Sequence, residues 1–397
     1  MEKDFSKSKK ISLDRSVLLF VLAIFLFATI LRTPLTVVGP IISFIRDGLG
    51  ISNVLAGFLT TIPLLAFAII SPFAPRLARR FGMEWTLFYS IILLCVGVAL
   101  RSVGITSLLI FGTVLIGVAI AFVNVLIPSY FKLKFPLHIG LLTAIYSVSM
   151  NISAGLAAGI SYSIASASGW QIALSFALLL GILTLVAWLP LLRTQKVETM
   201  VASIHAPKKQ LWRSPLAWAV AASMGLQSLI FYCSSAWLPE IFIAQGLEAG
   251  AAGWMVSIMQ LAQIPMTFFI PIIAGKLVTQ RPIVIFFSVC YLIGFTGVIL
   301  EWTSLAVLWM IFLGFAGGSS FGLVLMFFTL RTKTAYEAAE LSGFAQSIGY
   351  LLAAIGPVLF GYLHDATSSW FWPIAVFIGC ACILAVTAFK SANNRYV

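Results

Sequence analysis

Long apolar runs, separated by short polar segments, recur along almost the whole chain from Val17 to Phe389. Each run holds about 20 to 30 residues, and an α-helix of that length crosses the roughly 30 Å hydrocarbon layer of a bilayer when moderately tilted. The pattern therefore predicts an all-α membrane protein with twelve transmembrane helices. We place these helices at residues 16–45, 53–75, 85–103, 105–131, 139–165, 170–192, 214–243, 251–274, 282–300, 303–330, 341–363 and 370–389.

Composition supports the membrane assignment. Of the 397 residues, 61% are hydrophobic and only 9% are charged, whereas charged residues make up about 25% of a soluble globular domain. The basic segment before the first apolar run resembles the start of a secretory signal peptide, but that run is too long and lacks a small-residue cleavage site. We interpret it as the first transmembrane helix.

The formal net charge of +12 is also typical of proteins that bind nucleic acid. If the N-terminus is cytoplasmic, however, all but three of the 24 Lys and Arg residues fall in the termini, the linker or the cytoplasmic loops. Arg46 and Arg101 are then outside, and Arg32 lies within a helix. This distribution follows the positive-inside rule. It predicts a multi-pass protein of the cell (cytoplasmic) membrane with both termini cytoplasmic, and no nucleic-acid partner.

An internal repeat divides the chain into two halves. Residues 72–77 resemble residues 271–277, and Gly117, Lys132, Gly140 and Gly155 match Gly314, Arg331, Gly343 and Gly356 at a similar offset. We therefore predict two pseudo-symmetric six-helix bundles, residues 1–193 and 213–397, joined by a cytoplasmic linker at residues 194–212. Parallel repeats of this kind place a substrate site between the halves near the middle of the membrane, and they work by alternating access.

Arg32 is the clearest charged residue inside a predicted helix. It lies about 24 Å by helical rise from Ser16, so its side chain does not easily reach water at either membrane surface. A charge at this depth is costly and usually functional. The planar guanidinium suits a carboxylate or another small anion, and we interpret Arg32 as an anion-binding residue. The alternative is a structural arginine bonded to helix carbonyls that Pro34 leaves free.

The other intramembrane polar groups are neutral and come from both halves. Amides and phenols can bind a small polar solute, but they also join helices to one another. Gln227 and Tyr232 are favoured, because their helix is the repeat partner of the helix that carries Arg32, whereas Trp237 and Phe231 are interpreted as packing residues. The candidate substrate-binding residues are Arg32, Asn124, Tyr146, Asn151, Gln227, Tyr232, Gln260, Gln263, Gln346 and Tyr350.

The sequence lacks the residue patterns needed for several kinds of chemistry, namely carboxylate proton transfer, metal binding and catalysis. No Asp or Glu falls deep within a predicted helix, which argues against a membrane carboxylate as proton carrier. The five cysteines show neither metal-ligand nor CxxC spacing. No catalytic constellation or nucleotide-binding loop is found. We therefore expect no enzymatic activity, no cofactor and no metal site.

The loop at residues 71–82 resembles the signature loop of the major facilitator superfamily. It has Ser71, Pro75 and Ala78 where the superfamily pattern has glycine, aspartate and glycine, which puts the usual gating contact of the aspartate in doubt. The resemblance implies a gating role for the loop cations Arg76, Arg79 and Arg80, and for Lys276 in the second half. Further segments resemble the cyanate permease and 2-nitroimidazole transporter family, namely residues 31–32, 38–40, 124–128, 225–229, 236–239 and 346–351.

This resemblance implies a major facilitator fold and transport of a small anionic or polar nitrogen-containing solute. The leading hypothesis is a secondary active transporter with its substrate near Arg32. The alternatives are efflux of nitroimidazole-like or hydrophobic drugs and, from another class, a membrane sensor that transports nothing. The expected partners are a small molecule and the lipid bilayer, and the expected oligomeric state is a monomer.

Overall fold

The computed structural model describes residues 15–51, 53–192 and 210–397, which form helices and short connections with no strand among them. Among these residues, twelve helices are long and apolar enough to cross a membrane, which confirms the predicted number. The helices are α1 (Arg15–Thr36), α2 (Ile42–Leu49), α3 (Asn53–Ile70), α4 (Ala74–Phe81), α5 (Met83–Arg101), α6 (Thr106–Lys134), α7 (Ile139–Ser168), α8 (Trp170–Leu192), α10 (Pro215–Ala244), α11 (Ala249–Lys276), α12 (Arg281–Ile299), α13 (Ala306–Leu330), α14 (Ala335–Thr367) and α15 (Phe371–Ser391).

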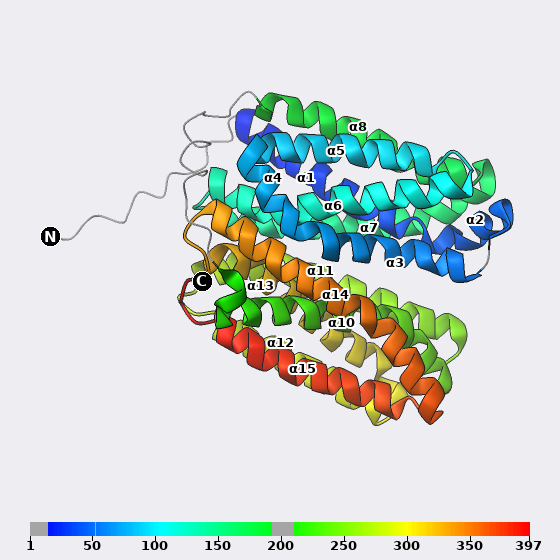
Figure 1. The fold of residues 1–397 in the computed structure, drawn as a ribbon. Helices are drawn as coiled ribbons and strands as arrows, with labels where there is room; N and C mark the ends of the chain where they lie inside the picture. The colour runs from blue at the N-terminus through cyan, green and yellow to red at the C-terminus, as the bar shows by residue number, and fades with distance from the viewer. Residues whose placement is uncertain (1–14, 52, 193–209) are drawn as a thin grey trace.

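The helices form two bundles that lie side by side (Figure 1). Helices α1 to α8 make up the N-terminal half, and α10 to α15 make up the C-terminal half. The halves meet chiefly through α7 against α11 and through α14 against α3 and α6. Most of the predicted linker lies outside the described residues, so the domain limits 1–193 and 213–397 stay a prediction.

The first predicted helix, residues 16–45, is wrong as a single element. Helix α1 ends at Thr36, a 3-10 turn follows at Gly39–Ile41, and α2 begins at Ile42. Proline has no backbone N–H and interrupts helical hydrogen bonding, and this segment contains Pro34 and Pro40. The second predicted helix is likewise divided: α3 ends at Ile70, and α4 begins at Ala74.

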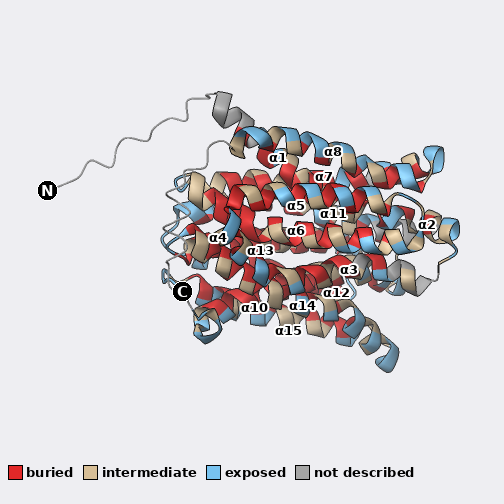
Figure 2. Cartoon of the chain, turned by 45° about the horizontal axis from the view of Figure 1, so that its top comes forward, coloured by how far each residue is buried: buried red, intermediate tan, exposed pale blue. Residues whose placement is uncertain are grey.

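Whether a side chain is buried or exposed depends on which face of its helix it lies on. Buried residues line the inside of each bundle, and exposed residues follow the outer faces (Figure 2). Many of the exposed residues are large and apolar, such as Ile69, Val186 and Val358. Contiguous exposed apolar surface is rare on soluble proteins, and on this protein it lies on membrane-spanning helices, where lipid would cover it.

We call the end of the molecule that holds α4 and the C-terminus the base, and the opposite end, which holds α2, the mouth (Figure 1). Glu340 lies at the base, because it contacts Arg79 of α4. Several hydrogen bonds and an ion pair join described residues of the two halves between the middle of the molecule and the base. They join Arg79 to Glu340, Lys132 to Thr329 and Thr332, Ser347 to Ala68, Gln346 to Asn124, and Asn151 to Thr267.

Two glycines bring the halves into close contact near the base. A Cβ on Gly140 would lie 2.6 Å from the carbonyl oxygen of Pro271, and a Cβ on Gly343 would lie 2.7 Å from that of Ser71. Each glycine therefore packs directly on the backbone of the other half. The two positions correspond in the internal repeat, so the same contact is made once in each direction.

Candidate functional site

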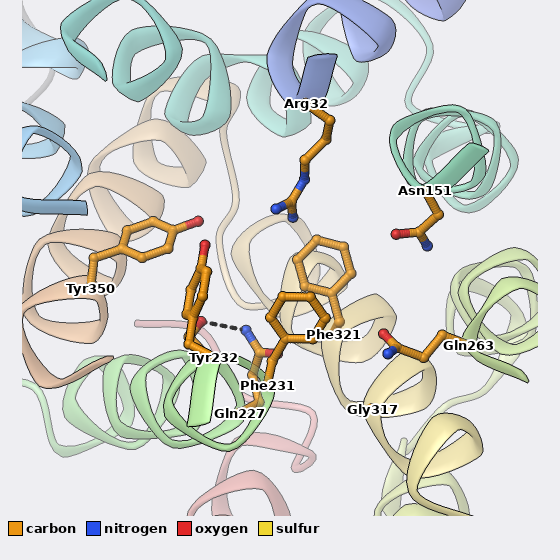
Figure 3. A pocket seen from close by; sticks show the side chains of 10 residues that line it. Arg32, Asn151, Gln227, Phe231, Tyr232, Gln263, Gly317, Phe321 and Tyr350 are labelled. Atoms are coloured by element: carbon orange, nitrogen blue, oxygen red, sulfur yellow. Dashed lines mark hydrogen bonds between the residues drawn. The ribbon is translucent and has the colours of Figure 1, made fainter. Parts of the chain in front are cut away.

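A cavity that is partly open to solvent lies between the two halves. The N-terminal half contributes Arg32 from α1 and Asn151 from α7, and the C-terminal half contributes the remaining lining residues from α10, α11, α13 and α14 (Figure 3). The lining therefore combines one charged residue with amides, phenols and aromatic rings. The residues from the C-terminal half are Gln227, Ser228, Phe231, Tyr232, Gln263, Gly317, Phe321 and Tyr350.

Arg32 is the one charged residue in the lining. Its side chain extends from α1 into the cavity, toward the side chains of the C-terminal half (Figure 3). It is partly buried, and within the described residues its guanidinium has no hydrogen bond or ion pair. A carboxylate is also absent from the lining. The cavity thus presents a positive charge that is available to a ligand.

The carbonyl oxygen of Pro34 bears on the alternative role considered for Arg32. It accepts a hydrogen bond of 2.7 Å from Nη1 of Arg101, at the end of α5. Arg101 therefore binds the end of α1, whereas the Arg32 side chain faces the cavity (Figure 3). The sequence placed Arg101 at the outer surface, but its side chain is only 1% exposed.

The other polar lining groups flank Arg32. The hydroxyls of Tyr232 and Tyr350 lie on one side of the cavity, and the amides of Asn151 and Gln263 lie on the other (Figure 3). The rings of Phe231 and Phe321 lie between them. A flat ligand can therefore stack on aromatic rings while its polar edges reach hydrogen-bonding groups.

Gln227 is oriented by its own helix. Its Nε2 donates a hydrogen bond of 2.7 Å to Oγ of Ser228 and lies 3.6 Å from the sulfur of Met224. The amide oxygen remains as an acceptor. Gln227 therefore offers the cavity a polar group whose position is set by its neighbours.

Three predicted binding residues, Asn124, Tyr146 and Gln346, do not line the cavity. The hydroxyl of Tyr146 donates to Oδ1 of Asn124 at 3.2 Å, and Nε2 of Gln346 donates across the halves to the backbone oxygen of Asn124 at 3.0 Å. Gln346 lies one helical turn from Tyr350 toward the base. These residues join the halves beneath the cavity. A fourth, Gln260, is exposed and is not part of the lining.

Four lining residues were not among the predicted binding residues: Ser228, Phe231, Gly317 and Phe321. Phe231 was interpreted as a packing residue. A signal for two of them was present, because Gln227, Ser228, Phe231 and Tyr232 fall on one face of a helix at spacings of one and four residues. A helical projection centred on Gln227 would have included Ser228 and Phe231.

Among the four predicted gating cations, Arg79 contacts the opposite half. Its Nη2 lies 2.7 Å from Oε1 of Glu340 on α14, and both side chains are largely buried. Arg76, Arg80 and Lys276 are exposed at the base. Arg76 lies over the ring of Phe73, and Arg80 lies over the ring of Phe81.

Lys132 also joins the halves, although the sequence indicated only that it lies on the cytoplasmic side. Its Nζ donates to the backbone oxygen of Thr329 at 2.6 Å and to Oγ1 of Thr332 at 3.0 Å. These groups lie at the C-terminal end of α13, where the helix dipole favours a cation. Two basic residues therefore bridge the halves at the base.

Reversing the charge of Arg79 should open the base. Arg79→Glu places two carboxylates together in a largely buried site, which costs several kcal/mol relative to the native pair. The double variant Arg79→Glu with Glu340→Arg should restore closure. Spin labels at Arg76→Cys and Lys276→Cys, with Cys382 replaced by serine, report the distance between the halves. An unchanged distance in the single variant would show that this pair does not hold the base closed.

Comparisons with known proteins were made for the whole chain. The family model of the Major Facilitator Superfamily matches residues 18–357. The chain is 44% identical to the uncharacterized transporter YycB of Bacillus subtilis (strain 168), with 92% of each protein covered. It is 39% identical to the 2-nitroimidazole transporter of Escherichia coli (strain K12), over 96% of this chain and 97% of that protein.

A more distant relative is the cyanate transport protein CynX of Escherichia coli (strain K12), which is 25% identical over 92% of this chain and 95% of that protein. Among solved structures, the proton:xylose symporter XylE bound to 6-bromo-6-deoxy-D-glucose aligns with a TM-score of 0.75 at 15% identity. That alignment covers 96% of this chain and 95% of XylE. At this identity the likeness supports the fold alone.

Proposed function

Because the chain belongs to the Major Facilitator Superfamily, a family of multi-pass membrane transporters that bind small molecules within the membrane, we propose that it is a secondary active transporter of small planar organic anions and polar nitrogen-containing solutes. The substrate binds between the halves, with its anionic or nitro group on Arg32. The protein is a carrier rather than an enzyme.

The observation that carries this proposal is the guanidinium of Arg32 in the cavity, which has no hydrogen bond or ion pair with any residue that the structure describes. An arginine inside a membrane is costly and is usually paired or functional. An anion with two oxygens can accept two parallel hydrogen bonds from a guanidinium. The lining has no carboxylate that would compete for Arg32. The site is therefore suited to an anionic or strongly dipolar head group.

The lining of the cavity and the names of two relatives support a small, flat body for the part of the substrate that does not contact Arg32. The cavity is bounded by aromatic rings and by polar groups from both halves, which is the usual composition of a small-molecule site. The rings of Phe231 and Phe321 suit a flat body. Two relatives are named for cyanate and for 2-nitroimidazole, which are small and either linear or planar.

Export of nitroaromatic or hydrophobic compounds is a second candidate function that would use the same cavity. The aromatic rings of the lining and the relative named as a 2-nitroimidazole transporter favour it. The two functions differ in the direction of net transport. A deletion strain that becomes more sensitive to nitroimidazoles would indicate export, and a strain that becomes more resistant would indicate uptake.

The proposed mechanism is alternating access. The bonds from Arg79, Lys132 and Ser347 hold the halves together at the base, so substrate would enter from the mouth. The halves would then close at the mouth, the base contacts would break, and substrate would leave there. With the termini in the cytoplasm of the cell membrane, as the positive-inside distribution favours, the mouth faces outward. We propose a monomer as the working unit, with no nucleic-acid partner.

Counterflow in proteoliposomes tests this function. Vesicles loaded with unlabelled 4-nitrobenzoate should take up external labelled 4-nitrobenzoate well above the rate of protein-free vesicles. 2-Nitroimidazole and cyanate should compete with this uptake. Failure of the purified, folded protein to exchange or bind any of these three solutes would contradict the proposed substrate class.

A further inference from the structure

Arg101 is a buried cation that contacts the end of the helix carrying Arg32. It is the last residue of α5, and its side chain is 1% exposed. Nη1 donates a hydrogen bond of 2.7 Å to the carbonyl oxygen of Pro34. Within the described residues, Nε and Nη2 are buried without a hydrogen-bond partner, and no carboxylate pairs with this guanidinium. Its positive charge is therefore not neutralised by a neighbouring side chain.

Close packing holds the backbone of Arg101 in place. A Cβ on Gly112 of α6 would lie 2.6 Å from the backbone nitrogen of Arg101, and a Cβ on Gly97 would lie 2.9 Å from the backbone oxygen of Gly112. Helices α5 and α6 thus pack with almost no space between them at this level. The start of the Arg101 side chain is fixed, and the guanidinium is directed to the end of α1.

That helix end matters for an anion bound at Arg32. Arg32 lies four residues before Thr36, the last residue of α1. The final carbonyl groups of a helix lack partners within the helix, and together they carry about half a negative charge. The last backbone bond here runs from the Val37 nitrogen to the Thr33 oxygen. An anion at Arg32 would therefore lie near a negative helix end unless a cation offsets it.

We propose that Arg101 is a positioning residue that makes the cavity selective for anions. Its bond to the carbonyl oxygen of Pro34, two residues beyond Arg32, fixes the last turn of α1, and its charge offsets the negative potential of that helix end. Arg101 does this without contacting the substrate. The inference rests on the proposed function, because it assumes that Arg32 binds an anionic group.

A purely structural arginine would have a different signature. Replacing such a residue would change the affinity for every ligand of the cavity by a similar factor, because the residue would act only through the fold. An electrostatic role affects ligands according to their charge. The discriminating quantity is thus the ratio of affinities for a charged and a neutral ligand of the same shape. 4-Nitrobenzoate and 4-nitrobenzamide form such a pair.

The experiment measures dissociation constants of both compounds by isothermal titration calorimetry on the purified full-length protein. Arg101→Gln removes the charge but keeps a hydrogen-bond donor, and Arg101→Lys keeps the charge. We expect Arg101→Gln to weaken 4-nitrobenzoate binding about 5- to 10-fold and to change 4-nitrobenzamide binding less than 2-fold. Arg101→Lys should retain most of the selectivity. Equal weakening of both compounds, or no change in their ratio, would overturn the inference.

A second substitution keeps the test decisive if Arg101→Gln does not fold. Ser102→Asp adds a negative charge one residue after Arg101 and so lowers the positive potential at this end of α5, and Ser102→Asn is the uncharged control of nearly the same shape. The aspartate variant should lower the ratio of the two affinities at least 3-fold relative to the asparagine variant. Equal ratios in the two variants would contradict an electrostatic role of Arg101.

The same titrations separate the inference from the function on which it rests. If the unmodified protein binds neither compound, or if Arg32→Gln leaves the ratio of affinities unchanged, the proposed function fails and the inference fails with it. If Arg32→Gln abolishes the preference for the anion and Arg101→Gln does not alter it, only the inference is wrong.

Discussion

Replacing Arg32 with glutamine should weaken binding of a small organic anion by about 100-fold, or roughly 2.7 kcal/mol. Arg32 is the one charged residue in the cavity lining. A charge-assisted hydrogen bond contributes about 1.5 to 3 kcal/mol, and glutamine loses both the charge and the paired donors of the guanidinium. A neutral ligand such as 4-nitrobenzamide should lose much less affinity.

Two variants complete this experiment. Arg32→Lys keeps the charge but cannot donate two parallel hydrogen bonds, so its affinity should lie between those of the other two proteins. Arg46→Gln is the control: Arg46 lies on α2 at the mouth, 2.9 Å from Oδ1 of Asp47, and does not line the cavity. Calorimetry measures binding, and thermal unfolding checks the fold. If folded Arg32→Gln binds the anion as tightly as the unmodified protein, Arg32 does not bind it.

Substituting alanine for both Gly140 and Gly343 should shift the protein toward a state that is open at the base. Each new Cβ would lie 2.6 to 2.7 Å from a carbonyl oxygen of the opposite half, which is closer than such atoms approach in folded proteins. Relief requires the backbones to separate. Overpacking of this kind costs about 1 to 3 kcal/mol per site, so the two sites together should change the ratio of the two states by at least about 30-fold.

Gly155→Ala is the matched control for the added methyl groups at Gly140 and Gly343. Gly155 lies on α7, as Gly140 does, but a Cβ there would meet no atom within 4 Å. Spin labels at positions 76 and 276, on the base of opposite halves, should report a longer distance in the double variant and an unchanged distance in the control. Transport should fall in the double variant, because one of the two states becomes rare. If the distribution of spin-label distances in the double variant matches that of the control, these glycines do not determine how often the base is closed.

Hydropathy was sufficient to predict which segments cross the membrane, because burial in lipid requires long apolar helices with internally satisfied backbones. It did not predict where a helix is interrupted. Residues 16–45 are uniformly apolar enough to appear as one helix, whereas α1 ends at Thr36. Pro34 and Pro40 accompany the interruption, and the carbonyl oxygen of Pro34 is bound by Arg101 of α5, a contact between distant segments that hydropathy does not reveal.

The candidate site was also predictable from the sequence only in part. Arg32 was recognisable because a charge inside a membrane is rare, and the structure places it in the cavity. Neutral residues gave no such signal: Asn151 lines the cavity, whereas Asn124 joins helices beneath it. Their amino-acid type and depth are similar. The difference arises from which face of each helix meets the opposite half, and that depends on packing between distant segments.

The signature-loop resemblance predicted gating residues only in part. Pro75 stands where the superfamily pattern has an aspartate, and it lies against Gly343 rather than offering a charge. Cohesion at the base comes instead from Arg79 with Glu340 and from Lys132 with the end of α13. The partners of these cations belong to the other half, so comparison of loop motifs alone does not reveal them.

Helix α14 runs unbroken from Ala335 to Thr367 and carries Tyr350 in the cavity and Glu340 at the base. The two residues are about 15 Å apart along the helix axis, and Pro357 lies on the mouth side of both. A rigid rod pivoting near Tyr350 by about 5° moves its other end by about 1.3 Å. That displacement would stretch the 2.7 Å contact of Glu340 with Arg79 beyond hydrogen-bonding distance. If a ligand at Tyr350 tilts α14 by this amount, the single rigid helix would carry that movement to the contact between Glu340 and Arg79 at the base.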